Sequence, residues 1–129
     1  MASVQALLDT SILIDLWRGS SGAIAWMRQY QSTTFGLPVI VCMELIDGAR
    51  NAAERQRAIA FIMSYPMLQL SIADSRWAQK QHSQFKLSYS VGILDALIAA
   101  PAARLNVPIY TLNTKHFTIL PGVSAIRPY

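Results

Sequence analysis

Short apolar runs alternate with longer amphipathic or densely apolar stretches along this chain, and the alternation predicts its secondary structure. The runs with the length and composition of strands are 4–8, 33–37, 67–72, 107–111 and, shorter, 123–126. The stretches predicted to be helical are 10–18, 23–31, 39–51, 54–65, 74–87 and 92–105. Strands that alternate with helices predict an α/β fold, with a parallel sheet of about four to five strands and helices on both faces. No linker or repeat divides the sequence, so we expect one domain over residues 1–129.

Individual residues predict where some of these elements begin or break. Thr10 and Ser11 follow the first apolar run and are good helix N-cap residues, and Asp74 is the N-cap candidate of the helix 74–87. Pro101 lies inside the apolar stretch 92–105, where a proline removes one helical hydrogen bond and costs about 3 kcal/mol. The sequence therefore predicts a kink or a break of the helix at Pro101.

The composition is that of a globular chain. Hydrophobic residues make up 53% of the 129 positions, which is ample for a core. No run of eighteen apolar residues predicts a membrane span, and the first residues lack the order of a secretion signal, so we expect a cytoplasmic protein. Cys42 is the only cysteine, which excludes an intramolecular disulfide and favours a small core residue.

The net charge of +4 and the pI near 9.6 favour an anionic partner. Arginine and lysine are scattered singly, and their densest group is Arg50, Arg55 and Arg57. No basic tail is present, so the charge is compatible with a nucleic acid and equally with an acidic protein.

Three of the seven carboxylates lie in strongly apolar segments, namely Asp9, Glu44 and Asp95. A buried carboxylate costs several kcal/mol unless a cation or hydrogen-bond donors compensate it, so a shared divalent metal is the leading explanation. Local satisfaction of each acid by a helix cap or an arginine is the alternative. Asp9 and Asn113 each follow a predicted strand, and Glu44 and Asp95 are expected near helix starts, so all four can meet at the carboxyl edge of the sheet.

Oxygen ligands of this kind suit Mg²⁺ or Mn²⁺, and such ions activate water for phosphodiester hydrolysis without a covalent nucleophile. Asp15 and Asp47 follow Asp9 and Glu44 on the same helices and are expected to face solvent or to support an arginine. His116, close to the predicted cleft, could bind a phosphate or the metal, or pack within its loop.

Four motifs occur in order along the chain, and a closing segment follows them. They are LLDTSILIDLWRG (7–19), MELIDGA (43–49), LDALIAA (94–100) and LNTKHF (112–117), followed by PGVSAIRPY (121–129). Together they resemble the PIN-domain ribonucleases, and most closely the VapC-type toxins of toxin–antitoxin pairs. The resemblance covers the whole chain and implies a PIN-like α/β fold.

The resemblance also implies roles for particular residues. Asp9, Glu44 and Asp95 would bind Mg²⁺ or Mn²⁺ and activate water for RNA cleavage, with a hydroxyl from Thr10 or Ser11 beside the first acid. The family often has a fourth acid in the last motif, but this chain has no Asp or Glu after Asp95. The residues that occupy the last motif are Asn113 and Thr114, followed by Lys115 and His116, the candidates for substrate contacts.

Two function hypotheses follow. The first is a metal-dependent endoribonuclease toxin, in which Asn113, with Thr114 in support, orients a water or a phosphate; the resemblance implies a small antitoxin over the cleft and a homodimer. The second is a PIN-fold module that binds RNA or a protein and has lost the metal, suggested by the missing fourth acid and by Pro101. An aspartyl phosphatase is disfavoured because its motif requires a second acid two residues after Asp9, where Ser11 stands.

Overall fold

Five parallel strands form the centre of the molecule. The computed structural model describes residues 3–129, and its sheet has the order β3-β2-β1-β4-β5, with every neighbouring pair parallel. The strands are β1 (Ala6–Leu8), β2 (Phe35–Pro38), β3 (Met67–Leu68), β4 (Ile109–Tyr110) and β5 (Ala125–Ile126). The chain leaves β1 toward β2 and β3 and then returns to the other side of β1 with β4, so the strand order reverses between β1 and β4.

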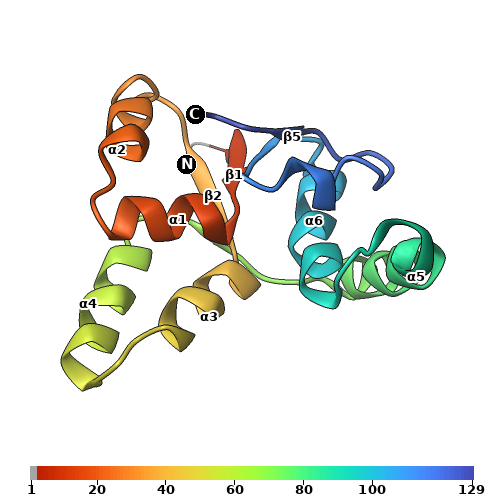
Figure 1. Ribbon diagram of the computed structural model, residues 1–129, viewed down its shortest axis with the longest axis horizontal. Helices are drawn as coiled ribbons and strands as arrows, with labels where there is room; N and C mark the ends of the chain where they lie inside the picture. Colours follow the sequence, from red (N-terminus) through yellow and green to blue (C-terminus); the bar gives the residue numbers. More distant parts are fainter. Residues whose placement is uncertain (1–2) are drawn as a thin grey trace.

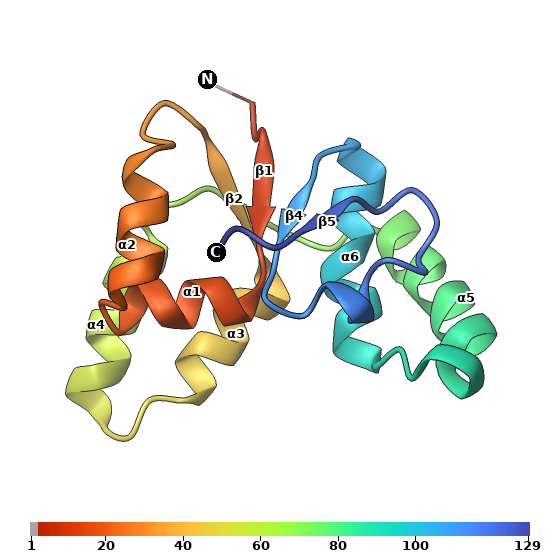
Figure 2. The same ribbon diagram turned by 45° about the horizontal axis from the view of Figure 1, so that its top comes forward.

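The helices flank this sheet in two groups. They are α1 (Thr10–Trp17), α2 (Ser21–Arg28), α3 (Val39–Asp47), α4 (Ala52–Ile62), α5 (Ile72–Tyr89) and α6 (Ile93–Leu105), with a 3₁₀ turn η1 (Thr114–His116). Figures 1 and 2 show α1 to α4 on one side of the strands and α5 and α6 on the other. The predicted α/β fold with helices on both faces is therefore confirmed. None of the helices within residues 3–129 is both long and apolar enough to cross a bilayer.

The core lies where the strands meet the helices. Leu7 and Leu8 point to opposite faces of β1, and both are fully buried, as a central parallel strand covered on both faces requires. Ile12 and Leu13 on α1 pack in the same cluster. Cys42 is also buried there, and burial raises the pKa of its thiol to about 11, which agrees with a small core residue.

Most element boundaries differ from the predicted ones by one to four residues, and three differences have a clear physical reason. The third strand ends at Leu68 instead of residue 72, because Ser71 caps α5 and the chain leaves the sheet there. Asp9 occupies the N-cap position of α1, while the hydroxyls of Thr10 and Ser11 bond to other parts of the molecule. Of the kink or break predicted at Pro101, the break is wrong: α6 continues to Leu105, and the residues on both sides of Pro101 are buried in the core.

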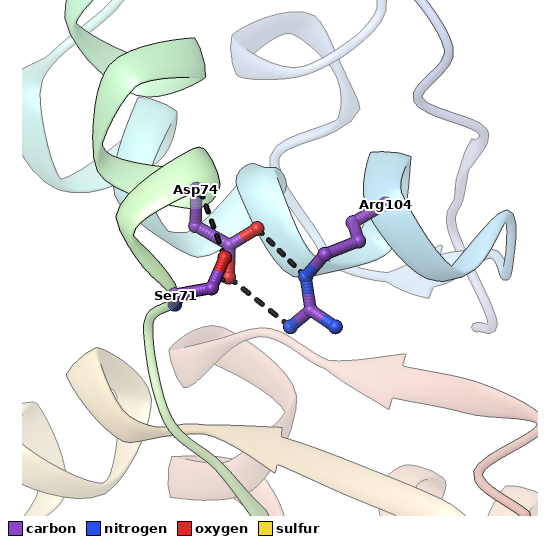
Figure 3. A network of polar contacts seen from close by, with 3 residues as sticks. All are labelled: Ser71, Asp74 and Arg104. Atoms are coloured by element: carbon purple, nitrogen blue, oxygen red, sulfur yellow. Dashed lines mark hydrogen bonds and ion pairs between the residues drawn. The ribbon is translucent and has the colours of Figure 1, made fainter.

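Asp74 is not an N-cap residue, and its role is larger than the sequence indicated. Ser71 caps α5, and Asp74, the third helical residue, accepts a hydrogen bond from the Ser71 amide at 3.0 Å. The Arg104 guanidinium donates to both Asp74 carboxylate oxygens, at 2.9 and 3.1 Å, and so joins α6 to α5 (Figure 3). Burial raises the pKa of Asp74, but the bonds from Arg104 and Ser71 outweigh it and the pKa lies below its ordinary value.

Candidate active site

The candidate site is built on the carboxyl ends of β1 and β4, where the strand order reverses. Asp9 follows β1 directly, and its amide donates to the carbonyl of Tyr110 at 2.9 Å, which fixes it beside the end of β4. In parallel sheets, ligands bind at such a reversal point. The sequence prediction that Asp9 lies at this edge is therefore confirmed.

The Asp9 carboxylate is held by two hydroxyls. Its side chain is buried, with 6% of the residue exposed. Thr111 Oγ1 donates to Asp9 Oδ2 at 2.7 Å, and Ser11 Oγ donates to the same oxygen at 3.2 Å. Both donors bond the charged acceptor directly, so they offset part of the desolvation cost of burying it.

Glu44 is brought to this edge by α3. The Thr10 hydroxyl donates to Glu44 Oε1, so the residue next to Asp9 holds the second acid. Glu44 is half-buried and is the sixth of the nine residues of α3, because that helix begins directly at the end of β2. The expectation that Glu44 lies near a helix start was wrong, but its carboxylate is still tied to the α1 terminus.

Asp95 joins the site from α6. It lies in the first turn, where its Oδ2 accepts the Gly92 amide at 3.1 Å and caps the helix. The same oxygen is 3.5 Å from His116 Nδ1 in η1. His116 therefore neighbours a candidate metal ligand instead of only packing in its loop.

The loop after β4 completes the arrangement. The backbone N–H of Asn113 donates to Thr111 Oγ1 at 2.9 Å, and the backbone N–H of Leu112 donates to Ser11 Oγ at 3.0 Å. The second bond fixes the loop against α1. Asn113 itself is exposed, and so are Lys115 and His116, while Thr114 is half-buried. Of these exposed polar residues, His116 lies beside an acid, Asp95.

Thr111 is the residue that sequence reasoning missed. It is fully buried, donates to Asp9 and accepts from Asn113, so it connects the first acid to the last motif. The available signal was its position: it closes the predicted strand 107–111, and parallel strands end at a common edge. A polar residue that closes one of two adjacent parallel strands is therefore a candidate site residue, as an acid is.

The three acids differ in burial. Asp9 is buried, but Glu44 and Asp95 are half-buried, so the premise of three buried charges holds only for Asp9. Within residues 3–129, no group of three or more His, Cys, Asp or Glu side chains is arranged to hold a metal. The donor chemistry still fits a hard ion, since Mg²⁺ keeps several waters and takes only one or two protein carboxylates.

The two remaining acids behave differently from this group. Asp47 is exposed, as expected. Asp15 accepts a hydrogen bond from the Tyr129 hydroxyl at 2.8 Å, so a tyrosine, and not an arginine, is its partner. Burial, followed by the bond to Asp15, raises the pKa of Tyr129. This contact ties the last residue of the described chain to α1.

Comparisons with known proteins give the family. The sequence model described as PIN domain matches residues 6–120. Ribonuclease VapC of Rickettsia bellii (strain RML369-C) is 30% identical over 125 residues, which are 93% of each chain. Ribonuclease VapC10 of Mycobacterium tuberculosis is 29% identical over 113 residues, which are 86% of this chain and 84% of the relative.

Solved structures agree in fold. A toxin–antitoxin complex from Klebsiella pneumoniae has a chain that matches with a TM-score of 0.77 and 28% identity, covering 97% of this chain and 98% of that one. VapBC2 from Rickettsia felis, bound to a promoter DNA fragment, matches with a TM-score of 0.78 at 18% identity, covering 95% and 98%, which shows the fold alone. The chain belongs to the PIN-domain family, and within it to the VapC type.

Proposed function

We propose that this chain is a metal-dependent endoribonuclease and the toxin of a toxin–antitoxin pair. The observation that carries the proposal is the buried Asp9 carboxylate at the strand reversal, bonded to Thr111 and Ser11. Thr10 brings Glu44 to the same terminus, and the last motif brings His116 to Asp95. The family membership supplies the chemistry for which these acids are suited.

In this mechanism Asp9, Glu44 and Asp95 would hold Mg²⁺ or Mn²⁺. When bound, the ion would lower the pKa of a water and would neutralise charge on the scissile phosphate. The chain itself supplies orientation, since Thr111 and Ser11 fix Asp9 and Thr10 fixes Glu44. Water adds to phosphorus as the bond to the leaving oxygen breaks.

The exposed residues of the last motif are assigned to the substrate. Asn113 stands in the last motif, and its side-chain amide can orient the attacking water or a phosphate oxygen without adding negative charge. Lys115 and His116 offer donors to the RNA backbone beside Asp95. Thr114 supports this turn through its carbonyl, which accepts from the Phe117 and Thr118 amides.

The function is tested by RNA cleavage with metal added and removed. Purified protein incubated with single-stranded RNA and Mg²⁺ or Mn²⁺ is expected to produce internal cuts. Excess EDTA is expected to stop the reaction, and added Mn²⁺ to restore it. Calorimetric titration with Mn²⁺ separates the two hypotheses: a binding isotherm supports the enzyme, whereas no binding and no cleavage would favour the metal-free binding module.

Thr111 gives a second prediction. Thr111→Val keeps the shape but removes the hydroxyl that bonds Asp9 and Asn113, so RNA cleavage is expected to fall about 10- to 100-fold, as for other residues that orient a metal ligand. Thr111→Ser retains the hydroxyl and serves as the control, with cleavage within about threefold of wild type expected. Equal rates for the Val and Ser variants would show that the hydroxyl has no positioning role.

The proposal includes two protein partners. Toxin–antitoxin complexes are among the structural neighbours, so we infer that a small antitoxin covers the acidic site of this chain. The product of a short adjacent reading frame should inhibit cleavage when mixed with the protein at equal concentration.

A homodimer is also proposed. It would cover the apolar side chains that are exposed around the α5–α6 junction, namely Leu87, Tyr89 and Ile93. A molecular mass near that of one chain, measured by light scattering, would exclude the homodimer. We propose that the protein acts in the cytoplasm, where RNA of the proposed substrate class is present.

A further inference from the structure

A cleft of about 590 Å³ lies between α1, α3 and α4, next to the proposed active site. Arginines line it from three segments: Arg18 at the end of α1, Arg50 after α3, and Arg57 on α4. Glu44 belongs to the same lining. The cleft therefore shares a wall with the candidate metal site, and Figure 2 shows the three helices that surround it.

The arginines of the cleft are not equivalent. Arg50 donates through Nε and Nη2 to one oxygen of Glu54, at 3.1 Å each, and this bond lowers the pKa of Glu54. The positive charge of Arg50 is therefore neutralised by Glu54. In the part of the chain that the structure describes, the only other arginine ion pair is Arg104 with Asp74, so Arg18 and Arg57 are exposed cations that form no ion pair. The charge of Arg57 also contributes to the lowered pKa of Glu54, but less than the bond from Arg50.

An aromatic ring lies among these charges. Trp17 lines the cleft and packs on Phe61, with the ring centroids 5.4 Å apart, so its position is fixed. Guanidinium groups match the geometry of phosphate oxygens, and an indole face stacks on a nucleobase. An acidic peptide would use the arginines but has no need of the ring, and the volume lies in the usual range for organic ligands.

We propose that this cleft binds single-stranded RNA a few nucleotides from the cut, with Arg18 and Arg57 contacting backbone phosphates. The inference rests on the proposed nuclease function, because Glu44 joins the cleft to the site of cleavage. Contacts remote from the reacting bond bind substrate and transition state alike. They are therefore expected to set the affinity for RNA and leave the chemical step unchanged.

Binding is measured without cleavage, by fluorescence anisotropy of a fluorescein-labelled, mixed-sequence RNA of about 12 nucleotides in EDTA. Arg18→Gln and Arg57→Gln are each expected to weaken binding about fivefold and to lower the salt-dependence slope by about 0.7, the value for one lost phosphate contact. Arg28→Gln and Arg55→Gln are matched controls. Arg28 lies on α2 and Arg55 on α4, the helix that carries Arg57; both are exposed, and neither lines the cleft. Controls should bind within about twofold of wild type.

Two further measurements sharpen the test. Glu54→Gln removes a negative charge from the cleft, whereas the arginine variants remove a positive one. The Glu54 variant is therefore expected to bind RNA more tightly. In metal-supported cleavage, the Arg18 and Arg57 variants should raise KM about fivefold and keep kcat within about twofold.

The outcomes separate this inference from the function on which it rests. Unchanged RNA affinity and an unchanged salt slope in both Arg18→Gln and Arg57→Gln would overturn the RNA subsite. This holds even if these two variants bound an acidic protein more weakly, and even if the wild-type protein cleaved RNA normally. Absence of cleavage by wild type with either metal would overturn the nuclease. The EDTA binding data would still decide whether the cleft holds RNA.

Discussion

Asp9→Asn is expected to lower RNA cleavage at least about a hundredfold while leaving the protein folded. Asparagine has the shape of aspartate and can still accept the Thr111 hydroxyl, but it lacks the charge that a divalent ion needs. Removing a buried charge also removes its desolvation cost, so the melting temperature should stay equal or rise. Loss of activity without loss of stability distinguishes a functional acid from a structural one.

Asp15→Asn is the control for this experiment. It is the same substitution on the same helix, and the amide can still accept the bond from Tyr129. Its cleavage rate should remain within about twofold of wild type. Calorimetric Mn²⁺ binding should weaken for the Asp9 variant and not for the control. Cleavage by Asp9→Asn within about tenfold of wild type would contradict the assignment of Asp9 as a metal ligand.

Asp74→Ala is expected to give the largest loss of stability, about 2–3 kcal/mol, or a melting temperature lower by about 10 °C. The substitution removes the carboxylate that accepts the Ser71 amide and leaves Arg104 without its partner. Breaking a fully buried pair costs about 3–5 kcal/mol, and the smaller figure applies because 38% of the Arg104 side chain is exposed. RNA cleavage at a temperature where the variant is folded should be unchanged.

The pH dependence of this loss has a definite sign. The pKa of Asp74 is lowered in the folded state, so its contribution is complete above the ordinary carboxyl pKa of about 4 and disappears as the pH falls through the lowered value. Urea unfolding at pH 7 and at successively lower pH should show wild type and Asp74→Ala converging. Asp47→Asn, at an exposed acid, should lie within about 0.5 kcal/mol of wild type throughout. A difference that stays constant to the lowest pH would exclude the ion pair as its source.

The order of strands and helices was predictable because burial on both faces of a parallel sheet requires continuous apolar runs, such as the one around Leu7. The strand ends were not predictable to the residue. The strand β3 has two residues, and the apolar residues that follow it belong to a short irregular connection and to the start of α5, where Ile72 is 74% exposed. An apolar side chain alone does not report whether the sheet continues.

The candidate site was predictable in part for a related reason. An acid in an apolar segment is visible locally, so Asp9, Glu44 and Asp95 could be selected from the sequence. Their partners could not, because Thr111 is 102 positions from Asp9, and Arg104 is 30 from Asp74. A local reading therefore gave Asp74 a capping role only. It also overestimated the effect of Pro101, since packing around α6 outweighs one lost backbone bond.

The separation between Asp9 and Thr111 has a consequence for the nascent chain. The first strand and the first acid leave the ribosome early, but the hydroxyl that holds that acid belongs to the last fifth of the sequence. β1 also lies between β2 and β4, so the sheet cannot close until β4 has been synthesised. A growing or prematurely terminated chain thus carries its acids without an ordered site. Activity is therefore expected only after β4 and Thr111 have been synthesised.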